Sequence, residues 1–440
     1  MAEVLIAGAG IGGLSAAIAL ERAGVADLRV SVIEQSSQLG EVGAGVQLGP
    51  NVTRVLRAWG VDKILEPYAF EPNSIEVFSA KSGKLLAELP LGLTFRNRYG
   101  APYLTAHRAD LHACLHSCLI NSGFARIELN QKLHSVRSSN SDVEVLIESN
   151  KSIQSQISDS TNTVSTHQRH YSALIGADGV WSKVRDIFFD QNSSSDRGST
   201  KSVTFSGDLA YRSLVLQKML PQHLRSTCVK VWLGPNMHLV QYPIRAGEWL
   251  NSVLILSPRP HNHKGFVSTK NVIEALDWTI KMSGEEKAFN IQSIFPQVCL
   301  KIQDTLRAIE SWNVWPLMRG EPLAGSEQMV NGRVALLGDA AHPMLPYLAQ
   351  GAGMAIEDAF ALGEQFRAFG AASLVGKGIE GPLLNYAKNR WSRNARVQSR
   401  ALQNAGIFHA EGGLAWARDR SLQLWGAKLL DMPWLYGYRA

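Results

Sequence analysis

The 440-residue sequence predicts a protein of the α/β (α+β) class. Three observations lead to this prediction. The first 34 residues read as strand, glycine turn, helix and strand, residues 203–295 hold short apolar segments separated by turn residues, and residues 381–408 have a helical pattern. We therefore expect a Rossmann-like domain, an inserted lobe of mixed β-sheet, and helices toward the C-terminal end.

The opening strand and turn predict a dinucleotide site. The apolar run Val4–Ala7 is followed by Gly8, Gly10 and Gly13 in the pattern G-x-G-x-x-G. The first glycine makes a tight turn, the second lets the backbone approach a pyrophosphate, and the third lets the following helix pack on the strand. The pattern alone is weak evidence, but here it stands between a strand and a helix, as a dinucleotide site requires.

The second strand, Leu28–Ile33, ends on Glu34. An acidic side chain about 20 residues beyond such a glycine turn can hold ribose hydroxyls. The N-terminus of the intervening helix offers free N–H groups to phosphate. Strand, turn, helix and acid therefore stand in the order that a nucleotide site needs.

Composition narrows the class of protein. The net charge of +6 is modest for this length and no basic tract is present, so we expect no nucleic-acid partner. The four cysteines are scattered, which favours a reducing compartment, and we expect a cytoplasmic protein. The longest apolar runs are too short to cross a membrane.

One cluster resembles a metal site but is not predicted to be one. His112 and His116 would share one face of a helix, and Cys114 and Cys118 another, so the two pairs point in different directions. No further ligand cluster lies nearby in sequence. We expect no metal ion.

Further elements are expected in this order: a helix from Asn51, its N-cap, to Trp59; a hairpin over 74–89; and a helix over 107–121. Residues 149–170 are rich in Ser, Thr, Asn and Gln and predict an exposed, mobile loop between two strands. Near the C-terminal end we expect a solvated face on the last long helix, formed by Arg390, Arg393, Arg396 and Arg400.

Three glycine and acid motifs recur at wide spacing. The first is the opening turn, the second is Gly176-Ala-Asp-Gly-Val-Trp-Ser-Lys-Val-Arg185, and the third is Leu337-Gly-Asp-Ala-Ala-His-Pro343, which continues through Gln350-Gly-Ala-Gly-Met354. Together with Arg108, they resemble the single-component FAD-dependent aromatic hydroxylases typified by para-hydroxybenzoate hydroxylase. The salicylate, 3-hydroxybenzoate and 6-hydroxynicotinate hydroxylase branch is the most similar, and the resemblance covers nearly the whole chain.

The resemblance implies an FAD site made by residues from all three motifs. The opening turn would take the pyrophosphate, Glu34 the adenosine ribose, and Asp339, which directly follows a buried strand, the ribityl hydroxyls. A helix that starts at Gly351 would place its N-terminus at the flavin ring, where it stabilises negative charge. Asp178 is associated with the cofactors in the family, although it would also suit a simple helix cap. The implied cofactor-binding residues are Gly8, Gly10, Gly13, Glu34, Arg108, Asp178, Gly338, Asp339, Gly351, Ala352 and Gly353.

The resemblance also implies a reaction. NADH or NADPH would reduce FAD, O2 would form a C4a-hydroperoxyflavin, and a small aromatic substrate, a phenolic carboxylate, would be hydroxylated. His238 and Tyr242 stand four residues apart on a predicted strand and so share a face, where they would contact the substrate hydroxyl. Arg212 would pair with the substrate carboxylate or, alternatively, make a structural ion pair. His238 and Tyr242 would otherwise be ordinary core residues.

The implied domains are an FAD-binding domain in two parts, 1–200 and 301–365, a substrate lobe over 201–300, and a helical region over 366–440. Two alternatives stay open: an FAD-dependent epoxidase or hydroxylase of a larger secondary metabolite on the same fold, and a non-enzymatic dinucleotide-binding regulator. The oligomeric state is expected to be monomer or homodimer.

Overall fold

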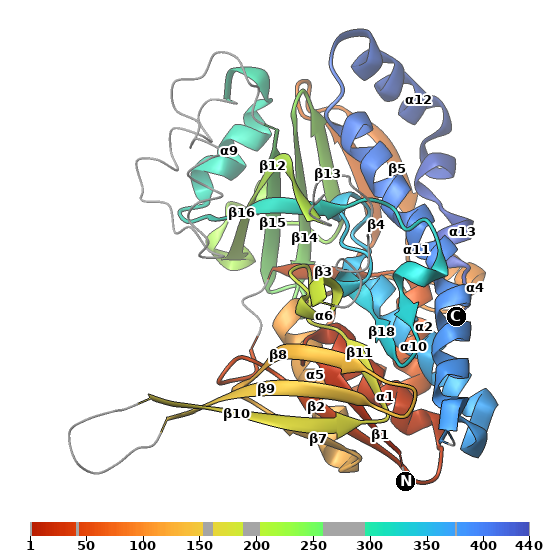
Figure 1. Cartoon of the computed structure of the whole chain (residues 1–440). Helices are drawn as coiled ribbons and strands as arrows, with labels where there is room; N and C mark the ends of the chain where they lie inside the picture. The colour runs from red at the N-terminus through yellow and green to blue at the C-terminus, as the bar shows by residue number, and fades with distance from the viewer. Residues whose placement is uncertain are drawn as a thin grey trace, which may run out of the picture.

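The computed structural model describes residues 2–40, 44–152, 162–187, 203–257, 295–374 and 376–439. In Figure 1 a parallel sheet with its helices lies in the lower half and a second, larger sheet in the upper half. Long helix α11 packs against both parts, because its first half contributes to the core of the parallel sheet and Ala401 packs beneath the upper one. In the described part of the chain, no helix has both the length and the hydropathy to cross a membrane.

The lower sheet has six strands in the order β17-β18-β11-β1-β2-β7. All neighbours pair in parallel except the short β17. The strands are β1 (Ala2–Ala7), β2 (Leu28–Ile33), β7 (Ala125–Glu128), β11 (Ala173–Gly176), β17 (Val330–Asn331) and β18 (Val334–Leu336). The helices of this part are α1 (Ile11–Ala23), α2 (Pro50–Trp59), α3 (Val61–Leu65), α5 (Arg108–Ser122), α6 (Lys183–Arg185) and α10 (Gly351–Phe369). Strand β1 is buried almost throughout, as a central parallel strand must be.

A three-stranded antiparallel sheet projects from this domain, formed by β8 (Gln131–Ser138), β9 (Val143–Ser152) and β10 (Asn162–Tyr171). The prediction of a loop over 149–170 is therefore wrong at both ends. Ser149 pairs with Ser165, and the ladder continues from Asn162 to Tyr171. The polar residues were misleading because an exposed hairpin needs few apolar side chains. The middle of the predicted loop, 153–161, lies outside the described residues.

The upper sheet has seven strands in the order β16-β12-β15-β14-β13-β4-β5. The predicted strands between 203 and 256 are all present, as is the hairpin over 74–89. The strands are β4 (Ser74–Ser79), β5 (Leu85–Pro90), β12 (Val203–Leu216), β13 (Val229–Gly234), β14 (Met237–Ile244), β15 (Trp249–Leu256) and β16 (Asn313–Gly320). A small pair, β3 (Gly45–Leu48) and β6 (Leu104–His107), joins the two parts.

The remaining helices are α4 (Leu93–Tyr99), α9 (Leu300–Ala308), α11 (Glu380–Phe408), α12 (Gly412–Leu430) and α13 (Pro433–Tyr436). Helix α9 covers one face of the upper sheet through a core that includes Trp232 and Ile302. The opposite face packs on α11 and on the short helix η7 (Pro346–Leu348). This second face carries the predicted catalytic side chains.

Candidate active site

A cavity of about 420 Å³ opens at the carboxyl ends of the parallel strands. Glu34, Asp178 and Asp339 each follow a different strand of that sheet, and all three line the cavity. Parallel strands end at one edge, which is where open α/β sheets bind ligands. Nine of the eleven predicted cofactor residues lie on its wall, namely Gly8, Gly10, Glu34, Arg108, Asp178, Gly338, Asp339, Gly351 and Ala352.

The glycine turn has the shape that its sequence predicts. Gly8 has a φ of +102°, and a Cβ there would lie 2.5 Å from the carbonyl oxygen of Ala177. A Cβ on Gly13 would lie 1.8 Å from the carbonyl oxygen of Gly8, so only glycine lets α1 approach β1 this closely. The His112 Nε2 lies 2.7 Å from the carbonyl oxygen of Ala9 and supports the turn from α5.

Two helix N-termini face the cavity without a capping side chain. Helix α1 starts after Gly10, helix α10 starts after Gln350, and neither has an acidic residue in its first turn. Their N–H groups and positive dipole ends are therefore available to an anionic ligand. Glu34 accepts hydrogen bonds from the backbone N–H of Ala9 (2.9 Å) and of Ser36 (3.0 Å), which fixes its carboxylate on the cavity wall. This set of groups fits a ligand with a pyrophosphate and sugar hydroxyls.

Two predicted residues have a second explanation in the structure. Asp178 supports the start of α6, whose N-cap is Ser182: its carboxylate accepts from the Ser182 hydroxyl at 2.5 Å and from the Lys183 N–H at 2.7 Å. Burial raises the pKa of Asp178 despite these bonds. Gly353 lies on the side of α10 that packs against α2, since a Cβ there would lie 2.8 Å from the Val52 side chain. It allows α10 and α2 to pack closely.

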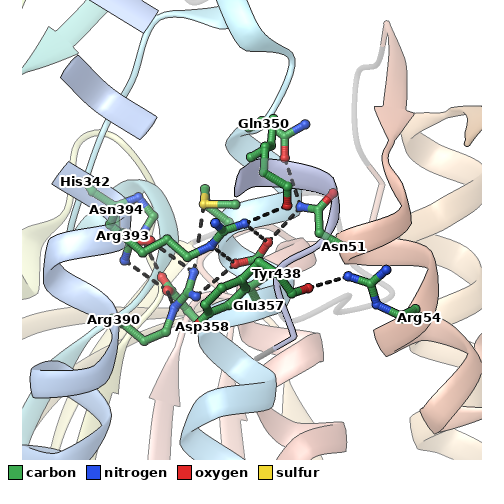
Figure 2. Close-up of polar contacts among 12 residues, drawn as sticks. Asn51, Arg54, His342, Gln350, Glu357, Asp358, Arg390, Arg393, Asn394 and Tyr438 are labelled. Carbon is green, nitrogen blue, oxygen red and sulfur yellow. Dashed lines mark hydrogen bonds and ion pairs between the residues drawn. The ribbon is translucent and has the colours of Figure 1, made fainter. Parts of the chain in front are cut away.

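A buried network of charges holds the third motif, residues 337–354, in place (Figure 2). Arg393 binds Glu357 through two hydrogen bonds of 2.7 and 2.8 Å, and Arg390 Nε donates to Asp358 at 2.8 Å. The prediction of a solvated arginine face is therefore wrong for Arg390 and Arg393, which are 0% and 8% exposed. Of the four arginines, Arg396 is exposed and Arg400 is half-buried. Burial would raise the pKa of both carboxyl groups, but Arg390 and Arg393 hold the pKa of Glu357 below its ordinary value, and His342 and Arg390 do the same for Asp358.

The network reaches the cavity through Asp358. Its carboxylate accepts from the backbone N–H of Gly338 at 3.2 Å and lies 2.5 Å from the His342 Nε2. Both partners flank Asp339, so Asp358 fixes the turn that carries this cavity residue. His342 is completely buried.

Asn51 belongs to the same network rather than to a helix cap. Helix α2 starts at Pro50 with Gly49 as its N-cap, so the prediction of Asn51 as N-cap is wrong. Its side-chain amide donates to Glu357 at 2.7 Å and to Gln350 at 3.1 Å. Asparagine is common at helix starts, but Asn51 instead contacts residues about 300 positions away along the chain. The local sequence does not reveal such contacts.

The predicted catalytic residues lie on one face of the upper sheet. His238 pairs with Ile255, and Tyr242 with Asn251, across the β14–β15 ladder. Between these two rows lies the row of Arg212, Val253 and Val240, which is half-buried whereas His238 and Tyr242 are buried. Paired residues point to the same face of the sheet. The most exposed of these three rows therefore lies between the His238 and Tyr242 side chains.

Arg212 has the features of an anion site. Its guanidinium stacks 5.0 Å above the Trp315 ring, and its buried Nε has no hydrogen-bond partner among the residues that the structure describes. The charge of Arg108, on the cavity wall, adds to burial in lowering the pKa of Arg212. The sheet face and the cofactor cavity are therefore close enough to interact electrostatically.

Tyr242 and His238 have different surroundings. The Tyr242 ring packs against Gly45, where a Cβ would lie 2.5 Å from it. Burial raises the pKa of Tyr242, although Arg212 and a hydrogen bond with Gln47 oppose this. Burial lowers the pKa of His238 well below its ordinary value, and His409 adds to this effect. Within the described part of the chain, no group of three or more His, Cys, Asp or Glu side chains is placed to hold a metal ion.

Comparison with known proteins decides the family. Residues 1–223 and 251–401 match the FAD binding domain family. The 3-hydroxybenzoate 6-hydroxylase of Polaromonas naphthalenivorans is 33% identical over 99% of this chain and 96% of its own length. The chain belongs to the FAD-dependent aromatic hydroxylases. It is accordingly a flavoprotein monooxygenase with FAD as its cofactor, and the alternative of a non-enzymatic regulator is excluded.

Other members of the hydroxylase family agree in length and fold. The 3-amino-4-hydroxybenzoate 2-monooxygenase PtnB3 of Streptomyces platensis is 31% identical over 100% of this chain and 96% of its own length. Klebsiella pneumoniae HpxO, solved with FAD and uric acid, superposes with a TM-score of 0.75 at 20% identity, over 98% of this chain and 94% of its own. A salicylate hydroxylase substrate complex gives 0.73 at 21% identity, over 99% and 95%. These two structures support the fold.

Proposed function

We propose that this hydroxylase acts on a small phenolic carboxylate, with NADH or NADPH as reductant and O2 as oxidant. The observation that carries the proposal is the half-buried row on the sheet face, with His238 on one side and Tyr242 on the other. It holds the Arg212 cation, whose buried Nε has no hydrogen-bond partner in the described part of the chain. The names of the relatives, which act on hydroxybenzoates, support the same substrate class.

The cavity residues would hold FAD as their chemistry suggests. The turn at Gly8 and Gly10 with the N-terminus of α1 would bind the pyrophosphate, Glu34 the adenosine ribose, and Asp339 the ribityl hydroxyls. The N-terminus of α10 would stabilise negative charge on the flavin ring. When bound, FAD supplies the activated oxygen, and the protein must orient the aromatic ring and remove or polarise its phenolic proton.

The two side chains beside the half-buried row would divide this task. The lowered pKa of His238 keeps its imidazole neutral at pH 7, so it can accept a proton. The raised pKa of Tyr242 keeps its hydroxyl protonated, so it can donate a hydrogen bond to the phenolate oxygen that forms. His238→Ala and Tyr242→Phe should both retain FAD and slow product formation, by about 100-fold or more for the general base.

The test of the activity is a panel of aromatic acids with the purified holoenzyme. Substrate-dependent oxidation of NADH or NADPH, oxygen uptake and a hydroxylated product should coincide for a hydroxybenzoate. A response only to polycyclic phenols would favour the larger-substrate alternative. If His238→Ala and Tyr242→Phe both turned over the true substrate at normal rates, their assignment would be wrong.

The carboxylate role of Arg212 has its own test. Arg212→Met should raise KM for 3-hydroxybenzoate by at least about 30-fold, because a buried charge-assisted pair is worth about 2–5 kcal/mol. KM for 3-hydroxybenzyl alcohol, which lacks the carboxylate, should change little. Equal losses for both compounds would show that Arg212 is structural. Arg319→Met, on neighbouring β16, is the control, since this arginine pairs with the exposed Glu321.

A further inference from the structure

His238 is the inner end of a continuous chain of hydrogen bonds. Its Nδ1 lies 2.8 Å from the His409 Nε2, and the His409 Nδ1 lies 2.7 Å from the Ser257 hydroxyl. Ser257 in turn donates to Asp208. Tyr347 donates to the other oxygen of the Asp208 carboxylate at 2.6 Å.

The chain is assembled from four separate parts of the sequence. Asp208 lies within β12, at the irregularity between Phe205 and Leu209, whereas Ser257 directly follows β15 and His238 is the second residue of β14. The three strands are neighbours in the upper sheet. His409 is added from the end of α11. Asp208 and His238 are 8% and 1% exposed, whereas His409 and Ser257 are half-buried.

The donor at each bond follows from counting protons. An ionised carboxylate only accepts, so the single hydroxyl proton of Ser257 points to Asp208. Ser257 must then accept from His409, which places the proton of His409 on Nδ1. A neutral His409 has its lone pair on Nε2 and accepts from the Nδ1–H of His238.

This order leaves the lone pair of a neutral His238 on Nε2. In the part of the chain that the structure describes, that nitrogen has no hydrogen-bond partner. Both imidazoles are neutral near pH 7, since burial lowers the pKa of His409 to about 4, with Arg418 acting in the same direction and Asp208 opposing. His238 is thereby held as the tautomer that a base needs.

We propose that Asp208, Ser257 and His409 are positioning residues that set the tautomer of His238 and accept the proton it removes. The proposal rests on the proposed function, with His238 as base. The phenolic O–H bond breaks and an N–H bond forms at His238 Nε2. The Nδ1 proton of His238 then moves to His409 Nε2, that of His409 moves to Ser257, and the hydroxyl proton of Ser257 moves to Asp208. The substrate is left as a phenolate, Asp208 as a neutral acid, and no electron is transferred.

The experiment follows the protonation of a bound phenol. 3-Hydroxy-4-nitrobenzoate has a phenolate that absorbs visible light, so its apparent pKa on the FAD-loaded enzyme can be titrated by difference spectroscopy. Ser257→Ala breaks the chain and should raise that pKa by about one unit or more, a tenfold loss of phenolate. It should also lower kcat for the true substrate while KM changes less than threefold. Ser257→Thr keeps the hydroxyl and should recover most of both signals.

Control variants distinguish the loss of the hydrogen-bond chain from misfolding and from an error in the proposed function. Ser206→Ala removes a hydroxyl beside Asp208 that receives only its backbone N–H, and should match wild type. His409→Phe should resemble Ser257→Ala. If Ser257→Ala and Ser257→Thr gave equal phenolate fractions and pH profiles, the chain would have no role, even with activity intact. A wild-type enzyme that hydroxylated no aromatic acid would instead overturn the proposed function.

Discussion

The cofactor cavity and the sheet face that carries His238 are lined by different kinds of chemical group. The cavity wall combines backbone groups, from glycine turns and two uncapped helix N-termini, with carboxylates that follow the strand ends. The sheet face is made of side chains that meet from distant segments, such as His238 and His409. A backbone site fails when one glycine gains a Cβ, whereas a side-chain site fails when one proton donor is lost. Different single substitutions are therefore expected to disrupt the two regions.

The largest effect is expected where the two regions are joined. Arg390 pairs with Glu357 and Asp358 at full burial, on the helix that also ends at the His409 chain. Arg390→Met leaves two buried carboxylates short of a partner and should lower the free energy of unfolding by about 3–5 kcal/mol. Denaturant unfolding with excess FAD measures this loss.

A matched control lies on the same helix. Among the described residues, Arg400 donates a hydrogen bond to Gln403 near the surface and has no other polar partner, so Arg400→Met should change the free energy of unfolding by less than about 0.5 kcal/mol. Equal losses in both variants would mean that the buried network does not hold the fold together.

A smaller effect, confined to the cavity, is expected at Gly8. Gly8→Ala puts a Cβ 2.5 Å from the Ala177 carbonyl oxygen at a φ of +102°. The resulting strain of about 1–3 kcal/mol at the turn should weaken FAD binding by roughly 10- to 100-fold, measured by flavin fluorescence on the reconstituted apoprotein. Gly24→Ala has a positive φ but open space around it, and should bind FAD normally. If Gly24→Ala lost FAD equally, the turn itself would not be responsible.

This contrast explains what could be predicted from the sequence. That Gly8, Glu34 and Asp339 lie on one cavity wall was predictable, because each motif is short and its backbone geometry is local. His409 and Asn51 were not, because their partners lie 171 and about 300 residues away. The prediction of a solvated face at the buried arginines was wrong for a related reason. Arg390 and Arg393 look like a solvated face until Glu357 and Asp358 are placed one helix away.

The pH dependence of stability tests the two histidines of the sheet face. His238 and His409 both have a lowered pKa in the folded state, to about 4 for His409, while an unfolded histidine titrates near 6.5. Between these values the unfolded chain binds more protons, so stability should fall as pH drops from about 6.5 to 4. His409→Gln should flatten this slope. The control variant His134→Gln, at an exposed position of β8, should keep it. A wild-type slope in His409→Gln, measured with saturating FAD, would place the titrating groups elsewhere.

The smallest effect is expected at Tyr347, and its sign is informative. Tyr347→Phe removes one of the two hydroxyl donors to Asp208 but leaves the bonds through Ser257 and His409 to His238. A carboxylate with one donor fewer is more basic, so it should accept the relayed proton more readily. The apparent pKa of bound 3-hydroxy-4-nitrobenzoate should then fall slightly, by less than about half a unit. A rise comparable to that of Ser257→Ala would mean that Tyr347 lies on the path of the proton, so that the side-chain site extends to the segment beside the cofactor cavity.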